Sequence, residues 1–123
     1  MQKLLLRKWK KQGKKLSIAT SSDKELFIPT LEREGIIDSF DEIITVNQVP
    51  RGKNHPDIYI EAAKRMEIEK NSCVVFEDII TAIESAKRGG FGVVAVEDEK
   101  SLINKRAIME IADKYITTFK QLL

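Results

Sequence analysis

Two adjacent carboxylates, Glu77 and Asp78, are the side chains of this sequence that are best placed for chemistry. They directly follow Cys73–Phe76, a short apolar, β-prone run of the kind found in strands that are covered on both faces. A helical pattern and a second apolar run, Val93–Val96, come next, which predicts two parallel strands joined by a helix. Open α/β sheets bind ligands at the carboxyl ends of such strands. Asp78 could equally serve only as the N-cap of the helix, since aspartate is a common cap.

A hydroxyl cluster and a lysine could join this pair. Thr20 and Ser21 close the predicted strand Lys15–Thr20, and free backbone N–H groups at the start of the next helix also suit an anion. Lys53 lies in the long loop Asn47–Asp57, from which it could reach over the strand ends. Hydroxyls bind phosphate oxygens, lysine neutralises their charge and carboxylates hold Mg²⁺. Lysines in loops are usually solvated and have no such role. The prediction of a phosphate site therefore rests on the order of these groups along successive strand–helix units.

Length and composition are those of a single soluble globular domain, residues 1–123, with 42% hydrophobic and 33% charged residues. No apolar run approaches the roughly 20 residues of a membrane span, and no signal-peptide pattern opens the chain, so no membrane partner is expected. The single cysteine, Cys73, lies in a predicted buried strand, which fits a reducing cytoplasm. His55 is the only histidine and has no metal-ligand neighbours in sequence, which argues against zinc.

The charge is spread unevenly. Residues 1–15 contain seven lysines and arginines and no acid, so the rest of the chain carries a net charge of −5 although the whole carries +2. Leu5, Leu6 and Trp9 share one side of a predicted amphipathic helix at residues 1–12. Trp9 among lysines could stack on a nucleic-acid base. With one aromatic residue and no second basic patch, we expect it instead to pack on the sheet.

The remaining pattern predicts an α/β fold, a parallel sheet with helices on both faces. The predicted helix 24–34 contains Pro29, so we expect a kink there or a helix that starts only near Ile28. The other predicted elements are a strand at 42–46, helices at 57–66, 79–88 and 102–111, a short edge strand at 115–116 and a last helical turn at 118–123.

Taken together, three segments resemble the haloacid dehalogenase-like superfamily of phosphatases and phosphomutases, nearest to its β-phosphoglucomutase-like branch. They are LSIATSS around Thr20, RGKNHPDIYIEAAKRM around Lys53, and VVFEDIITAIESAKRGGFGVVAV around Glu77 and Asp78. The resemblance implies a three-layer Rossmann-like fold and small phosphorylated metabolites as substrates. It implies that Thr20, with Ser21 beside it, binds phosphate and that Lys53 stabilises a phosphorylated aspartate. It also implies that Glu77 and Asp78 anchor Mg²⁺.

The sequence departs from the family pattern in three places. Lys53 is followed by Asn-His-Pro, where the family usually has proline directly after the lysine. Ile79 stands where a serine commonly follows the acidic pair. Most important, these residues contain no Asp-x-Asp-Gly motif, whose first aspartate is the family's nucleophile, and no helical cap after it. We therefore expect no phosphoryl transfer by this polypeptide, and at most weak phosphate or metal binding.

The missing motif also removes a strand, which in the family lies between the strands that end at Thr20 and Glu77. Unpaired backbone groups are costly when buried, so we expect these two strands to close up and pair with each other; the alternative is an oligomer in which a partner chain supplies the missing strand. Open edges would otherwise favour self-association. The sequence leaves open a truncated product, a piece of a longer protein and half of a split enzyme. The alternative functions are a non-catalytic module that binds phosphate or a partner and, less favoured, nucleic-acid binding through residues 1–15.

Overall fold

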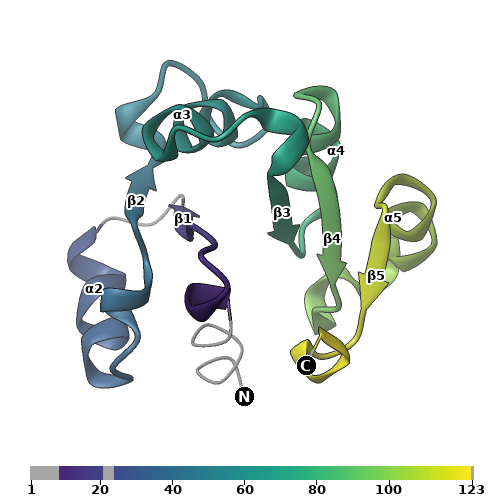
Figure 1. Ribbon diagram of the computed structural model, residues 1–123. Helices are drawn as coiled ribbons and strands as arrows, with labels where there is room; N and C mark the ends of the chain where they lie inside the picture. Colours follow the sequence, from purple (N-terminus) through teal and green to yellow (C-terminus); the bar gives the residue numbers. More distant parts are fainter. Residues whose placement is uncertain (1–8, 21–23, 123) are drawn as a thin grey trace.

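The computed structural model describes residues 9–20 and 24–122, in which short strands alternate with helices (Figure 1). The strands are β1 (Ser17–Thr20), β2 (Glu42–Thr45), β3 (Val74–Glu77), β4 (Gly92–Val96) and β5 (Lys114–Ile116). The α-helices are α2 (Lys24–Arg33), α3 (Asp57–Met66), α4 (Ile80–Arg88) and α5 (Lys105–Ile111). Turns of 3₁₀ helix span Ile37–Ser39, Val46–Gln48, Lys70–Ser72, Glu99–Asn104 and Phe119–Leu122. Within the described ranges, no helix is long and apolar enough to cross a membrane.

Most predicted elements are present, with ends that differ by a few residues, and α3 has the predicted bounds. The late start predicted for the Pro29 helix is wrong, because α2 begins at Lys24 and continues through Pro29. Pro29 is exposed in the second turn, so it removes only one intrahelical hydrogen bond from the helix. The helix predicted at 102–111 begins as 3₁₀ helix and becomes α-helical only at Lys105.

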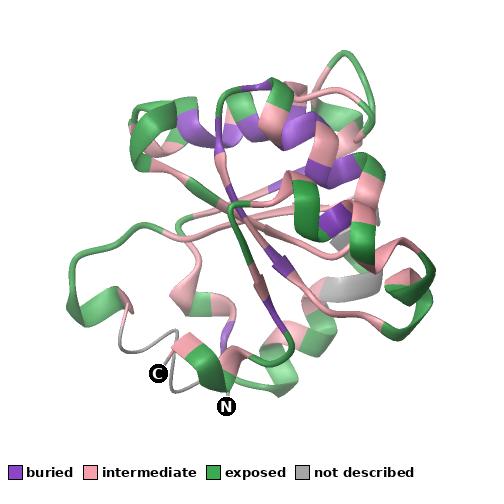
Figure 2. Cartoon of the chain, turned by 90° about the vertical axis from the view of Figure 1, so that its right-hand side faces the viewer, coloured by how far each residue is buried: buried purple, intermediate pink, exposed green. Residues whose placement is uncertain are grey.

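The strands form two parallel sheets. β1 pairs with β2, and β3, β4 and β5 pair in that order. The register places Thr20 beside Thr45 in the first sheet and Glu77 beside Ala95 in the second. Helical segments lie above and below the strands, which confirms the predicted α/β fold (Figure 2).

β1 and β3 do not pair with each other in the described part of the chain, so the expected closure of the sheet is wrong. A cavity of about 770 Å³ lies between them instead. Its walls include Ser17 and Ala19 of β1 and Val74, Val75 and Phe76 of β3. Figure 1 shows the two sheets apart, with α3 spanning the space above them. Because α3 packs against β1 and β2 and also reaches β3 through its side chains, it sets the separation of the two sheets.

Aromatic rings pack against β3 beside this cavity. The ring of Trp9 lies 5.4 Å from that of Phe76, which in turn lies 6.1 Å from Phe119. Trp9 is half-buried, and the expectation that it packs on the sheet is confirmed. Leu5 and Leu6, predicted to share its helix face, lie outside the described residues. These rings oppose an approach of β1 and β3 to the strand spacing of about 4.8 Å.

The hydrophobic core borders the cavity through Tyr59, Ala62, Ala63 and Phe91, and its most deeply buried residues lie in other strands and helices. Ile44 of β2, Ile58 of α3, Ile83 of α4 and Val93 of β4 have no exposed surface. By contrast, every residue of β1 and β3 is half-buried or exposed, and Val74 of β3 is 56% exposed. The middle of the strand arrangement is therefore less buried than its flanks.

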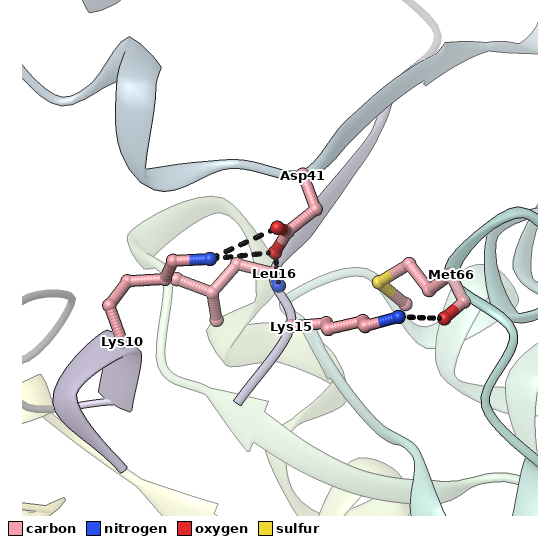
Figure 3. Close-up of polar contacts among 5 residues, drawn as sticks. All are labelled: Lys10, Lys15, Leu16, Asp41 and Met66. Carbon is pink, nitrogen blue, oxygen red and sulfur yellow. Dashed lines mark hydrogen bonds and ion pairs between the residues drawn. The ribbon is translucent and has the colours of Figure 1, made fainter. Parts of the chain in front are cut away.

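Polar contacts hold the start of β1 in place (Figure 3). The Asp41 carboxylate accepts the backbone N–H of Leu16 at 2.7 Å and pairs with Lys10 Nζ at 3.0 Å. Lys15 Nζ donates to the Met66 carbonyl oxygen at the end of α3, at 2.8 Å. These contacts fix β1 against the start of β2 and the end of α3, although β1 has a strand neighbour on one side only among the described residues.

Candidate active site at the carboxyl ends of the strands

Lys53 and Glu77 meet at the carboxyl end of β3, as the sequence predicts. Lys53 Nζ lies 2.8 Å from Glu77 Oε2, and their side chains are only 23% and 9% exposed. Glu77 is the last residue of β3, whereas Lys53 comes from the loop that leaves β2. The loop that follows β2 in the first sheet thus brings Lys53 to the last residue of β3 in the second sheet.

Tyr59 of α3, which was not among the predicted site residues, completes this contact. Its hydroxyl donates to the same Glu77 Oε2 at 2.8 Å. Burial, followed by the charge of Glu77, raises the pKa of Tyr59 far above its usual value, so the phenol keeps its proton and remains a donor. The sequence could have suggested Tyr59 as a site residue, because it follows Ile58 at the start of the predicted helix 57–66.

Both oxygens of the Glu77 carboxylate accept hydrogen bonds. Its Oε2 accepts from Lys53 and Tyr59, and its Oε1 accepts the backbone N–H of Asp78 at 3.2 Å. Burial alone would raise the pKa of Glu77, but the charge of Lys53 and these hydrogen bonds outweigh burial and leave the pKa lowered. Glu77 is therefore an anion that orients Lys53, with less capacity left to bind a metal ion.

Asp78 has the opposite electrostatic environment. Burial raises its pKa, and the neighbouring charges of Glu77 and Asp98 raise it further. Asp98, which follows β4, was not among the predicted site residues. Asp78 is not the N-cap of α4, because the cap residue is Ile79 and no side-chain cap hydrogen bond forms there. The alternative that Asp78 serves only as a helix cap is therefore wrong. Instead, Asp78 lies near the like charges of Glu77 and Asp98.

The other predicted phosphate-binding residues lie on the first sheet. Thr20 ends β1 and aligns with Thr45 of β2, so it belongs to the opposite side of the cavity from Glu77. Ser21 lies outside the described residues. The structure therefore brings Lys53 into direct contact with Glu77, beside Asp78, and Thr20 lies at the carboxyl end of a strand in the other sheet.

The Lys53 loop is held at both of its ends. Arg51 pairs with Asp57 at 2.7 Å, across the loop. Arg88, the last residue of α4, donates to the carbonyl oxygen of Asn54 at 2.8 Å. Next to it, Gly89 packs so closely that an added Cβ would lie 2.7 Å from the Cβ of Pro56. The end of α4 thus positions the loop that carries Lys53.

A magnesium ion fits these residues in part. Carboxylate oxygens are its preferred protein ligands, and the pKa of Asp78 is raised first by burial and then by the negative charges of Glu77 and Asp98, which a cation would offset. Most oxygen capacity of Glu77 is taken by hydrogen-bond donors. The described residues contain no group of three or more acidic, histidine or cysteine side chains arranged to hold a metal ion. Asp78 is the side chain best suited to a metal, supported by the charge of Asp98.

The chain is similar in sequence and in fold to known proteins. A model of the haloacid dehalogenase-like hydrolases matches residues 2–90. The phosphorylated carbohydrates phosphatase of Thermotoga maritima is 30% identical over 115 residues, which cover 89% of this chain and 53% of that protein. A haloacid dehalogenase hydrolase of family IA from Entamoeba histolytica is 30% identical with a TM-score of 0.84, covering 97% of this chain and 54% of the other.

The β-phosphoglucomutase of Clostridium difficile shares the fold, with a TM-score of 0.82 at 23% identity. The match covers 98% of this chain and 50% of that structure. The chain therefore spans about half the length of relatives such as these.

Proposed function

Because this chain belongs to the haloacid dehalogenase-like hydrolases, we propose that it supplies the lysine and carboxylate part of an active site for phosphoryl transfer on small phosphorylated metabolites. The observation that carries the proposal is the buried contact of Lys53 with Glu77 at the end of β3, beside Asp78. A relative from Thermotoga maritima, named as a phosphatase of phosphorylated carbohydrates, supports this class of substrate.

Each side chain has a distinct role in this proposal. Lys53 presents an ammonium group to the phosphoryl oxygens, and Glu77 and Tyr59 fix its direction, so that little reorganisation is needed when charge develops. Asp78 holds Mg²⁺, which when bound would neutralise phosphate charge. Thr20 donates a hydroxyl hydrogen bond to the phosphate from the first sheet.

We propose that the 123-residue polypeptide alone does not turn over substrate. Its sequence contains no Asp-x-Asp-Gly motif, and covalent transfer needs a carboxylate in line with phosphorus. The half-buried free thiol of Cys73 is in keeping with the cytoplasmic location that we propose. Phosphate or metal binding without turnover would agree equally with a non-catalytic module derived from this fold.

Metal binding and turnover can be measured separately to test this proposal. We expect weak binding of Mn²⁺, used as a paramagnetic substitute for Mg²⁺, by water-proton relaxation. Asp78→Asn should abolish this binding, and Asp38→Asn, which changes an exposed aspartate on another loop, should preserve it. With Mg²⁺ and p-nitrophenyl phosphate, we expect no turnover. Turnover that Asp78→Asn removes would reveal a nucleophile in this chain, and equal Mn²⁺ binding by both variants would refute the metal assignment.

A further inference from the structure

A second group of lysine, glutamate and tyrosine side chains lies at the carboxyl end of β4. Lys105 Nζ lies 2.9 Å from Glu97 Oε1, and the Tyr115 hydroxyl donates to the same oxygen at 3.0 Å. The Lys105 ammonium also lies over the Tyr115 ring, 5.3 Å from its centroid, which is favourable for a cation. None of these three side chains has a role in the phosphoryl transfer proposed for the end of β3.

These contacts repeat those at the end of β3. The Lys53 cluster consists of Lys53, Glu77 and Tyr59, and the Lys105 cluster of Lys105, Glu97 and Tyr115. In each cluster, one glutamate oxygen contacts the lysine ammonium and accepts from the tyrosine hydroxyl, at 2.8 to 3.0 Å. Each glutamate stands at a strand end, the first as the last residue of β3 and the second directly after β4. A lysine that is already oriented loses less side-chain freedom when it binds an anion.

The register of the sheet places both clusters on one face. Glu77 of β3 is in register with Ala95 of β4, which is in register with Tyr115 of β5. Residues in register point to the same face of a sheet, and so do residues two apart along a strand. Glu97 continues the β4 ladder, because its N–H donates to the carbonyl oxygen of Ile116 at 2.8 Å. Glu77, Glu97 and Tyr115 therefore project from the same face.

The two glutamates are also close together along the strand ends. One strand spacing of about 4.8 Å and two residues of about 3.3 Å rise each separate their Cα atoms by about 8 Å. The side chain of Lys105 is 42% exposed and that of Lys53 is 23% exposed, so the second lysine is the more accessible to a ligand. A small metabolite bound at the Lys53 cluster thus has a second oriented cation near it.

The negative charge that follows Glu97 is directed away from this face. Asp98 has an extended backbone, so the alternation along the strand continues and places its side chain on the opposite face from Glu97. Its charge acts on Asp78, which also alternates with Glu77. An ion pair as exposed as that of Lys105 contributes little to stability. Ligand binding at a strand end explains its geometry better than a contribution to the fold does.

We propose that Lys105 binds a second anionic group, phosphate or carboxylate, of the phosphorylated substrate. The substrate is then a small metabolite with two anionic groups, one held at the Lys53 cluster and the other at Lys105. Glu97 and Tyr115 orient the lysine and do not contact the ligand. This inference rests on the proposed function, because the first group must bind at the Lys53 cluster.

Three six-carbon ligands test the proposal on the full chain with Mg²⁺ present. Fructose 6-phosphate has one anionic group, fructose 1,6-bisphosphate adds a phosphate, and 6-phosphogluconate adds a carboxylate. NMR titrations that follow the backbone amides measure each affinity and locate each ligand. We expect a doubly anionic ligand to bind about tenfold more tightly than fructose 6-phosphate and to shift the Lys105 and Tyr115 amides, because it gains a charge-assisted hydrogen bond. The tighter of the two identifies the second group as phosphate or carboxylate.

Three protein variants assign the preference to Lys105. Lys105→Met removes the charge and should reduce the preference to about twofold or less, whereas Lys105→Arg keeps the charge and should retain most of it. The matched control is Lys100→Met, which removes another exposed lysine between β4 and α5 and should leave the preference intact. The same spectra show whether each variant is folded.

The possible failures are distinguishable. Equal affinities of the natural chain for singly and doubly anionic ligands would overturn the assignment of Lys105 and leave the proposed function standing. The assignment would also be overturned by a preference that persists in Lys105→Met, or by one that Lys100→Met loses to the same extent. If none of the three ligands binds, the Lys53 cluster does not hold phosphate, and the proposed function fails together with this inference.

Discussion

At the scale of single residues, the candidate site depends on how Glu77 is held. A buried carboxylate is costly unless its oxygens accept hydrogen bonds, and here an ammonium, a phenol and a backbone N–H satisfy them. The arrangement explains why Glu77 remains ionised although it is buried, and why Lys53 does not extend into solvent. It also separates the roles of the two carboxylates, since Glu77 orients the lysine while the charged form of Asp78 is disfavoured by burial and by the charges of Glu77 and Asp98.

Tyr59→Phe tests this arrangement. The substitution removes one donor to the buried Glu77 and leaves its remaining contacts in place, so we expect the free energy of unfolding to fall by about 1–2 kcal/mol. Urea unfolding followed by circular dichroism measures the loss. The matched control is Tyr115→Phe, which removes a hydroxyl bonded to the more exposed Glu97 and should have little effect. Equal losses in the two variants would contradict a special role of Tyr59.

At the scale of elements, contacts between segment ends position the site. The end of α4 packs on the start of α3 and on the Lys53 loop through Gly89, Arg88 and their neighbours. The start of β1 is fixed through Asp41, in the segment that leads into β2. Both sets of contacts join elements that are distant in sequence.

Gly89→Ala should be strongly destabilising. The new Cβ would lie 2.7 Å from Pro56 and 3.2 Å from the Phe91 ring, so the loop or the helix end must shift, at a cost of about 1–3 kcal/mol. The control is Gly52→Ala in the same loop, where the nearest atom to the new Cβ is 3.8 Å away. Thermal unfolding should show a clear loss for the first variant and almost none for the second. If Gly89→Ala had no effect on the melting temperature, the end of α4 would not pack closely against the loop.

Asp41→Asn should alter the dependence of stability on pH. The backbone N–H of Leu16 lowers the pKa of Asp41, and Lys10 adds to this effect. The charged form therefore stabilises the fold fully above the unfolded pKa of about 3.9, and this contribution disappears as the pH falls through the lower folded value. We expect the variant to lose about 1 kcal/mol at neutral pH.

The difference in unfolding free energy between the natural chain and Asp41→Asn should shrink toward zero in strong acid. Denaturant titrations between neutral and acidic pH measure it. Asp38→Asn, in the same connection between α2 and β2, is the control and should follow the natural chain throughout. A difference that does not depend on pH would indicate that the charge of Asp41 is unimportant.

At the scale of the whole molecule, the chain consists of two sheets held by α3 around an apolar cavity. Strands β2 and β4 carry fully buried residues, whereas β1 and β3, the strands nearest the middle, retain solvent access. Such a molecule has backbone edges available for pairing, and self-association through them is a further expectation.

Hydrogen exchange should reveal this distribution. β4 is paired on both sides, and its Val93 and Ala95 have no exposed surface. β1 and β3 are paired on one side only among the described residues. We expect amides of β4 to exchange most slowly and those of β1 and β3 to exchange markedly faster. Exchange as slow in β1 and β3 as in β4 would indicate that these edges are covered in solution.

Local patterns in the sequence were sufficient for the elements and for part of the site. Apolar runs and helical spacing predicted the strands and helices, since both are encoded by neighbouring residues. The order of Lys53, Glu77 and Asp78 along successive strand–helix units predicted that they would meet, because parallel strands bring their carboxyl ends to one side. The same patterns left open a kink at Pro29 or a late start of its helix, and the late start is wrong, because the cost of one lost hydrogen bond was overestimated.

Tertiary packing decided what depends on residues far apart in sequence. The donation of Tyr59 to Glu77 and the repulsion between Asp98 and Asp78 follow from the way α3 and β4 lie beside β3. The separation of β1 from β3 has the same origin. Pairing them would satisfy backbone groups, which favours closure when strands are considered alone. In the folded chain, α3 and the rings that pack on Phe76 hold the two sheets apart, and a cavity remains between them.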